Sequence, residues 1–300
     1  MSRKQRNKHY GSDNRSSTLL PIANSSKYSD NSGSGFPEHL LRHININCGN
    51  QHHPQQATLE TLVPNAVFVA RDALSSKECQ EWINYAENNN AWDVVSHPAT
   101  KWIAHRECGR VQKNDWNMSH RLYQRIESVV QQISPQLDIF DKASLQSNSE
   151  KYIAITKSNN LPKYQPITCN PNLRLYKYTK GQWFGRHVDD SNRIDIPSVS
   201  TLSKCNNTSM NAPTFAGAAN VKEAQTEITV LFYLSSCRGG ATTFHPPHQR
   251  KKGGASVSFT PEEGAVLLHV HGDHCLEHEA EPVLEGVKYV LRTDIVYGIV

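Results

Sequence analysis

A histidine and an aspartate separated by one residue, His187 and Asp189, are the first residues whose spacing indicates metal chemistry. They offer one imidazole nitrogen and one carboxylate oxygen to a single ion. With a second, distant histidine they would complete the two-His-one-carboxylate face that holds non-haem Fe(II). On its own such a pair is most often a surface or hydrogen-bonded pair, so another part of the chain has to supply the third ligand.

A histidine-rich stretch at 269–278, HVHGDHCLEH, contains the candidates for that third ligand. The stretch also has a second interpretation, in which the residues His271, His274, Cys275 and His278 bind zinc. No Cys-x-x-Cys pair occurs in the chain to complete a zinc site of the usual kind. His269 follows strand alternation, which favours a histidine of the core, or one that supports a ligand, over a ligand itself.

Short strands separated by turn signals are expected to position these residues. The run LRLYKY at 173–178 alternates as a half-buried strand does, and Gly181 indicates a turn before His187. Further strands are expected at 227–234, 241–244, 256–259, 265–269 and 288–297. Many short strands with regular turns predict a mainly β fold, a sandwich or barrel.

Two helices are expected before these strands, after a first strand at 66–69. Ser75 and Glu78 have the spacing of a capping box, which predicts a helix start at that point. A second helix is expected from about 117 to 133, with one apolar stripe. Neither helix carries ionisable pairs that indicate chemistry, so both are expected to support the sheet.

The domain organisation follows from the composition along the chain. Residues 1–62 are rich in Ser, Asn, Gly, His and Gln and are expected to form a disordered polar tail. Residues 63–300 are expected to form one domain, with helical support at 63–170 and the β core at 171–300. Within the core, the low-complexity stretch 191–224 is expected to be a lid or a disordered insertion.

The overall composition excludes several classes of protein. The chain has 300 residues, 37% of them hydrophobic, and a formal net charge of +4 that is too small and scattered to predict nucleic-acid binding. No apolar run is long enough for a membrane span, and the amino terminus lacks the apolar core of a signal peptide. The seven cysteines form no close pairs and are expected to be reduced thiols, which predicts a cytoplasmic or nuclear protein. The basic start, RKQRNK at 3–8, is expected to be a solvated tail, with a nuclear import signal as the alternative.

Several segments, taken in order, resemble the iron- and 2-oxoglutarate-dependent dioxygenases of the prolyl 4-hydroxylase-like branch. LSSKEC at 74–79 is similar to the leading "LS-x-x-EC" helix of that branch. Residues 178–189 are similar to its "Y-x-x-G-x-x-[YF]-x-x-H-x-D" strand and turn. FYL at 232–234 with GGATTF at 239–244 resembles its "YL…GG-x-T-x-F" pair. The segment 278–289 resembles its closing "HE-x-x-PV-x-x-G-x-[KR]-Y", so the likeness spans about 63–300.

This resemblance implies a double-stranded β-helix, or jelly roll, with helices packed on one sheet. It implies that His187, Asp189 and His278 bind Fe(II) on one face and leave positions for 2-oxoglutarate and O2. Ascorbate remains open as an accessory cofactor. The chemistry would reside in metal and cosubstrate, which agrees with the lack of a conspicuous acid–base pair or nucleophile triad in the sequence.

The far carboxylate of 2-oxoglutarate would then need a fixed cation. Lys288, ten residues after His278, matches the position where the family places it. Arg292 lies four residues further on, on the same face of a strand, and its guanidinium can bind a carboxylate through two hydrogen bonds. Position favours Lys288, and Arg292 stays as the alternative. Tyr178 matches the tyrosine that hydrogen-bonds the cosubstrate, and Thr243 is a further candidate contact.

The implied reaction is oxidative decarboxylation of 2-oxoglutarate to succinate and CO2, coupled to hydroxylation of a C–H bond. A protein or peptide side chain, proline among them, is the expected substrate. The same chemistry on a small molecule is one alternative, and a jelly-roll binding module that has lost turnover is another. No substrate can be inferred from the sequence, because the loops around the expected pocket have no clear pattern.

Overall fold

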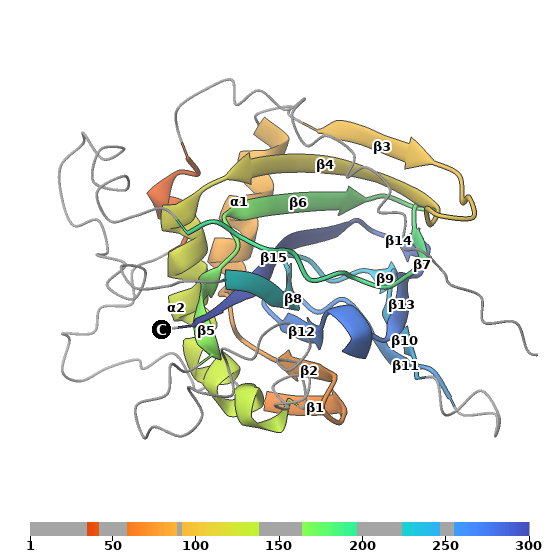
Figure 1. The fold of residues 1–300 in the computed structure, drawn as a ribbon. Helices are drawn as coiled ribbons and strands as arrows, with labels where there is room; N and C mark the ends of the chain where they lie inside the picture. Colours follow the sequence, from red (N-terminus) through yellow and green to blue (C-terminus); the bar gives the residue numbers. More distant parts are fainter. Residues whose placement is uncertain are drawn as a thin grey trace, which may run out of the picture. The chain divides into compact units, whose positions relative to one another are not determined.

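An antiparallel sheet of thirteen strands organises the described part of the chain (Figure 1). The computed structural model describes residues 35–41, 59–88, 92–137, 164–196, 224–246 and 255–299, which all belong to the unit Gly35–Val300. Along the sheet the strands follow the order β1-β2-β12-β8-β15-β6-β4-β7-β13-β10-β11, with β3 beside β4 and β5 beside β15. The sheet is nearly closed on itself and forms a jelly-roll-like fold, which confirms the predicted mainly β class.

The strands are short apart from β4, β8 and β15. Their bounds are β1 Leu59–Val63, β2 Val67–Ala70, β3 Asp93–His97, β4 Arg106–Asn114, β5 Tyr164–Cys169, β6 Asn172–Tyr178, β7 Phe184–His187, β8 Ala224–Tyr233, β9 Arg238–Gly239, β10 Thr242–His245, β11 Val257–Phe259, β12 Val266–Val270, β13 Glu277–Ala280, β14 Val283–Glu285 and β15 Lys288–Ile299. The strands β9 and β14 form a separate two-stranded sheet.

The two faces of the sheet have different partners because strand side chains alternate. On β15, Lys288, Val290 and Arg292 line a pocket inside the fold. Leu291, between them, belongs instead to the largest hydrophobic cluster of the structure. One strand therefore supplies both the core that holds the sheet and the polar groups of the pocket.

Two helices pack their apolar stripes against the outer face of the sheet (Figure 1). In α1 (Ser76–Asn88) the capping box is present: the Ser75 amide donates to the Glu78 carboxylate over 2.9 Å, and the Glu78 amide donates to Ser75 Oγ over 3.3 Å. In α2 (Trp116–Ile133) the Asp115 side chain caps the helix by accepting from the Met118 amide. Both predicted helices are thereby confirmed as supports of the sheet.

Two segments of the predicted polar tail take part in the fold. Phe36, Leu40 and Leu41 are buried in the same core as the helices, around a short 3-10 helix at Glu38–Leu40. β1 begins at Leu59, and pairs with β2. These segments escape a composition-based analysis because a few apolar residues in a polar stretch contribute little to its average.

The region 63–170, for which helical support was expected, contains the strands β2–β5 as well as α1 and α2. Most of the predicted insertion, 197–223, lies outside the described residues. The described cysteines, Cys79, Cys108, Cys169, Cys237 and Cys275, are free thiols. No helix among the described residues is long and apolar enough to cross a membrane.

Candidate metal centre

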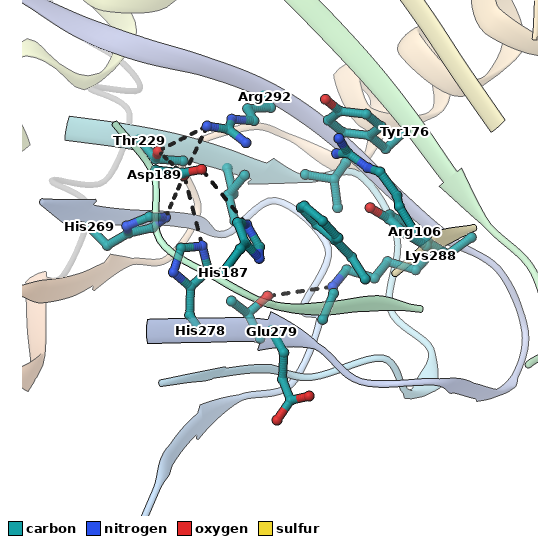
Figure 2. Close-up of a pocket in the computed structure, with 16 residues that line it drawn as sticks. Arg106, Tyr176, His187, Asp189, Thr229, His269, His278, Glu279, Lys288 and Arg292 are labelled. Atoms are coloured by element: carbon teal, nitrogen blue, oxygen red, sulfur yellow. Dashed lines mark hydrogen bonds and ion pairs between the residues drawn. The ribbon is translucent and has the colours of Figure 1, made fainter. Parts of the chain in front are cut away.

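Two neighbouring strands bring His187 and His278 side by side. In the antiparallel pair of β7 and β13, His278 lies directly opposite His187, and their ring centroids are 4.2 Å apart. Asp189 follows β7 after one residue, and its carboxylate turns back toward both rings (Figure 2). The pairing of β7 with β13 thus brings together two histidines that lie about ninety residues apart in the sequence.

Backbone carbonyls fix the orientation of both imidazoles. His187 Nδ1 lies 2.8 Å from the Gly185 carbonyl, and His278 Nδ1 lies 2.9 Å from the Leu276 carbonyl. Each Nδ1 therefore carries the proton and donates it, which leaves each Nε2 lone pair free. The two Nε2 atoms both lie 3.8 Å from oxygens of Asp189.

Burial keeps both imidazoles in the neutral form that a metal requires. Burial, together with the neighbouring His278, lowers the pKa of His187 to about 3. Burial also lowers the pKa of His278. The ligand atoms of His187, Asp189 and His278 all lie within 4.8 Å of one another, so the structure brings the three predicted ligands together.

The carboxylate of Asp189 is held by two donors on its Oδ2 atom. Arg292 Nη2 lies 2.8 Å from Oδ2, and the Thr229 hydroxyl donates to it over 2.7 Å. Burial alone would raise the pKa of Asp189, but the Arg292 guanidinium holds it well below its usual range. Asp189 is therefore an anion, and its Oδ1 atom accepts no hydrogen bond from the described residues.

A further histidine, His271, supports the Asp189 carboxylate through the Thr229 hydroxyl. His271 Nε2 contacts the Thr229 hydroxyl, and because that hydroxyl donates to Asp189, the imidazole is the donor. Asp294 lies 3.7 Å from both His271 Nε2 and Arg292 Nη2. His271 thus belongs to the surroundings of Asp189 and not to a zinc cluster with His274, which is exposed.

His187, Asp189, His278, Thr229 and Arg292 line one pocket, together with residues of β4, β6 and β10 (Figure 2). The lining residues are Arg106, Tyr176, Tyr178, Phe184, His187, Asp189, Thr229, Leu231, Thr242, His269, His278, Glu279, Ala280, Lys288, Val290 and Arg292. Arg292, Thr229 and His269 lie around Asp189, and Lys288 lies in another part of the pocket (Figure 2).

Lys288 is a buried cation without a carboxylate partner in the described part of the chain. Its ammonium donates to the Gly240 carbonyl over 2.7 Å and lies 3.5 Å from Thr242 Oγ1, and its side chain is almost fully enclosed. Burial lowers its pKa to about 8. A buried ammonium with only neutral acceptors is a ready site for an anionic group.

The two candidate cations consequently have different surroundings. Arg292 is engaged with the Asp189 carboxylate, whereas Lys288 lies apart from that ion pair in the pocket (Figure 2). This arrangement favours Lys288 as the group that binds the far carboxylate of a cosubstrate. It gives Arg292 a separate task, which is to hold the predicted metal ligand.

The remaining two predicted contacts differ in their location. Tyr178 lines the pocket on β6, opposite Lys288, whose ammonium lies 5.7 Å from the centre of the tyrosine ring. Thr243 does not line the pocket: its hydroxyl donates to Glu281 over 2.6 Å and contacts Ser258. Its neighbour Thr242 lines the pocket instead, because side chains alternate along β10.

Arg106 is a pocket residue that the sequence did not reveal. Its guanidinium lies 4.1 Å from the Phe184 ring centre and 4.6 Å from that of Tyr176, and its Nε atom has no hydrogen-bond partner. No motif surrounds it, and β4 reaches the pocket through its neighbours: Arg106 pairs with Phe184 of β7, and β4 also lies beside β6. The sequence analysis did not identify Thr229 either, because a threonine within an apolar strand carries no sign of a pocket location.

The donor set fits a divalent iron ion. Two neutral imidazoles and one anionic carboxylate converge with free donor atoms, which is the facial arrangement typical of non-haem Fe(II). Bonds of about 2.1 Å would require the donor atoms to approach to about 3 Å, so the observed 3.8 Å calls for small movements only. The pocket also fits a dicarboxylate, because Lys288 offers a second, separate anchor.

Comparisons with known proteins give structural likenesses of low similarity. No family model and no curated protein matches the chain. Among solved structures, the chain is similar to the viral collagen prolyl hydroxylase from Paramecium Bursaria Chlorella virus-1 in its 2OG complex (15% identity, 78% of this chain, 97% of that chain, TM-score 0.41). It is also similar to a Pseudomonas putida prolyl-4-hydroxylase (12%, 77%, 92%, TM-score 0.40).

A third likeness is to a Trichoplax adhaerens prolyl hydroxylase in complex with a hypoxia inducible factor oxygen degradation domain peptide fragment (14%, 78%, 84%, TM-score 0.42). The structural neighbours of the chain are thus prolyl hydroxylases and other 2OG-Fe(II) oxygenases. Since these likenesses are distant, the pocket residues have to carry the functional conclusion.

Proposed function

We propose that this chain is a non-haem Fe(II) dioxygenase that couples decarboxylation of 2-oxoglutarate to hydroxylation of a C–H bond on a protein or peptide side chain, proline among the candidates. The observation that carries the proposal is the pairing of two features in one pocket. One is the convergent set of His187, Asp189 and His278, and the other is the buried ammonium of Lys288, whose hydrogen-bond acceptors among the described residues are neutral.

Each pocket residue then has a defined task. His187, Asp189 and His278 hold the metal, and Arg292 and Thr229 orient the Asp189 carboxylate through its Oδ2 atom. When bound, iron would supply the oxidation, in which O2 and 2-oxoglutarate give succinate and CO2, and one oxygen atom of O2 enters the succinate while the other enters the C–H bond as a hydroxyl group. Lys288 binds the far carboxylate of the cosubstrate as a charge-assisted hydrogen-bond donor.

Tyr178 acts beside Lys288 as a neutral donor. Burial raises the pKa of Tyr178, so its phenol keeps the proton that it can donate to the cosubstrate. Apolar lining residues, Leu231, Phe184 and Val290, limit the water around the reacting groups. This exclusion protects the oxidising site from side reactions with water.

A macromolecular substrate is supported by exposed apolar side chains near the pocket. Trp102 is 79% exposed and Ile103 is 55% exposed in the connection between β3 and β4. Within four residues, the same segment reaches Arg106 in the pocket, and the Gly185 amide donates to the His105 carbonyl over 2.7 Å. Large apolar side chains exposed beside a pocket are typical of a surface that contacts a peptide or protein.

The experiment that tests the function is measurement of CO2 and succinate release from 2-oxoglutarate under air with Fe(II). It compares wild-type protein with His187→Ala and Asp189→Asn, each with and without a library of proline-containing peptides. His274→Ala is the matched control, because His274 is exposed and outside the ligand set. We expect turnover in the wild type and the control only, and stimulation by a subset of peptides.

Other outcomes would lead to other conclusions. Turnover that responds to small molecules but to no peptide would replace the proposed substrate class. Iron and 2-oxoglutarate binding without any turnover would indicate a binding module. Absence of both iron binding and turnover in the folded wild type would refute the enzyme proposal.

A further inference from the structure

A second group of metal-ligand atoms overlaps the predicted iron set. The side chains of His269, Cys275 and His278 each offer one ligand atom, and these atoms lie within 4.8 Å of one another. His269 comes from β12 and lines the pocket, whereas Cys275 comes from the turn before β13. His278 belongs to both this group and the group with His187 and Asp189.

His269 is the strongest evidence that this second group binds a ligand. The ring is almost completely buried, and its Nε2 atom has no hydrogen-bond partner among the described residues. That atom lies 3.6 Å from Asp189 Oδ2, and the ring centroid lies 4.4 Å from that of His278, so His269 faces the metal cavity (Figure 2). A buried nitrogen without a partner is costly in a folded protein unless a ligand binds it.

Cys275 supplies the third ligand atom of the group. The backbone amide of Asp189 donates to Cys275 Sγ over 3.2 Å, and Sγ lies within reach of the His269 and His278 ligand atoms. Burial raises the pKa of the thiol to about 11, so a bound metal has to displace its proton. The side chain is half-buried, so an ion can reach it. The cluster considered from sequence, with His271 and His274, is not formed, and His269 takes the place of those two residues.

We propose that His269, Cys275 and His278 form a second metal site that takes a thiophilic ion such as Zn(II), Cd(II) or Co(II). Thiolate and imidazole ligands prefer such ions, whereas the carboxylate set suits Fe(II). Binding exchanges the thiol proton, which passes to solvent, for a metal–sulfur bond. A fourth position on the ion is left for water.

The two sites exclude each other. His278 has one free lone pair, on Nε2, and it can bind one ion at a time. A thiophilic ion on the second site therefore removes one of the three iron ligands. The protein then has a built-in route to inhibition by thiophilic metals, and the site itself exists whether or not the pocket turns over 2-oxoglutarate.

The test uses Co(II) alone, added under anaerobic conditions to the full-length metal-free protein. Cobalt bound to a thiolate has a sulfur-to-metal charge-transfer absorption, which histidine and carboxylate ligands do not produce. His187→Ala and Asp189→Asn leave only the second set intact, and Cys275→Ser leaves only the first. Cys237→Ser is the matched control, because Cys237 is likewise half-buried but outside the ligand groups.

We expect the charge-transfer band in wild-type protein, in both iron-set variants and in the Cys237→Ser control. The band should vanish in Cys275→Ser, and His269→Phe should weaken cobalt binding in the iron-set variants by about 100-fold, the effect of losing one of few ligands. Equilibrium dialysis measures the bound cobalt, and circular dichroism checks that each variant folds.

Two results would overturn the inference: bound cobalt without the band in folded His187→Ala and Asp189→Asn, or a band that persists in Cys275→Ser. Failure of the proposed enzyme function is seen separately. In that case the wild type lacks turnover while the iron-set variants still show the band.

Discussion

Arg292 is the residue that most directly controls the predicted iron ligand, because it is paired with Asp189 inside the pocket. Removing it with Arg292→Ala leaves a buried carboxylate with one donor fewer and without its counter-charge. We expect metal affinity to fall by about 10- to 100-fold, the range typical of residues that support metal ligands. Titration with Mn(II), followed by its electron paramagnetic resonance signal, measures this change.

Arg292→Lys should recover part of the affinity, since an ammonium restores the charge but not the planar donor geometry. Arg238→Ala is the control. Arg238 forms an exposed ion pair with Glu285 and does not line the pocket. Unchanged metal affinity in folded Arg292→Ala would show that Thr229 alone suffices to hold Asp189.

Lys288 should act on the cosubstrate and not on the metal. Lys288→Ala removes the buried ammonium that faces only neutral acceptors. We expect the affinity for 2-oxoglutarate to fall by about 10- to 100-fold, which corresponds to a charged hydrogen bond of roughly 1.5–3 kcal/mol. Calorimetric titration of the Mn(II)-loaded protein measures it, and metal affinity in the same variant serves as the control.

A comparison with Arg292→Ala decides between the two cations. Loss of 2-oxoglutarate affinity in Arg292→Ala, with none in metal-saturated Lys288→Ala, would assign the carboxylate to the arginine.

The same lysine predicts how cosubstrate binding depends on pH. Burial lowers the pKa of Lys288 to about 8, so in the free protein the ammonium form dominates below pH 8 and is lost above it. Only the ammonium attracts a carboxylate. Affinity for 2-oxoglutarate should therefore be nearly constant from pH 6.5 to about 7.5 and decrease above pH 8.

Lys288→Arg is the control for this pH dependence, since arginine stays charged over the whole range. Provided that the variant binds 2-oxoglutarate, the decrease above pH 8 should disappear. An identical decrease in Lys288→Arg would assign the titration to another group.

At the residue scale, sequence motifs predicted the pocket residues that stand at fixed spacing in a motif. They did not predict the pocket residues that stand in no motif. The approach of His187, Asp189 and His278 was expected because a motif accompanies each of them. Arg106 and Thr229 stand in no motif, and their pocket location depends on which strands become neighbours. Thr243 shows how precise such a prediction has to be. Along β10, a shift of one residue moves a side chain from the pocket side of the strand to the other side, so Thr242 lines the pocket and Thr243 does not.

Among the elements, helix α1 allows a test of how much its capping residue, Ser75, contributes to the stability of the fold. Ser75→Ala removes the Oγ atom that accepts the Glu78 amide, and an unsatisfied helix start costs about 1 kcal/mol. We expect the free energy of unfolding in urea to fall by that amount without loss of metal binding. Ser76→Ala is the control, because Ser76 is exposed and is not the capping residue.

A larger effect than about 2 kcal/mol would mean that Ser75 does more than cap the helix. Its hydroxyl also contacts the Glu78 carboxylate, which Arg125 pairs with over 2.8 Å, so the cap is joined to α2 through this ion pair.

The strands divide into those that sequence patterns predict and those that they do not. The strands β6, β8, β12 and β15 carry apolar side chains toward the helices at every second position or in continuous runs, so their patterns are clear. β3, Asp-Val-Val-Ser-His, is largely exposed, and β13 reads Glu-His-Glu-Ala. β13 lacks a typical strand pattern because its most buried residue, His278, is a polar group of the pocket. The strands β7 and β13, which hold two of the predicted metal ligands, are thus harder to predict than β6, β8 and β15, which also line the pocket.

For the whole molecule, the pocket lies where two halves of the sheet meet. The smaller half, with β7, β13, β10 and β11, pairs with the larger half through one residue pair, Arg106 and Phe184. His187 and His278 belong to the smaller half. Asp189 follows β7 but is bound by Arg292 and Thr229 of the larger half. A metal on all three ligands therefore ties the smaller half to the larger one.

This arrangement predicts that metal binding stabilises the two halves unequally. At a Mn(II) concentration of about 100 times the dissociation constant, the folded state gains about 2.7 kcal/mol, or roughly 5–10 °C in melting temperature. Hydrogen exchange should slow most in β7 and β13, because local opening of the smaller half breaks metal bonds that opening of β1 or β2 does not. Asp189→Asn should remove both effects, since it weakens the link between the halves. An equal slowing in β1, β2 and β12 would show that the sheet opens as one unit, coupled by the Arg106–Phe184 pair and by the apolar cluster in which Phe244 and Phe259 pack against the larger half.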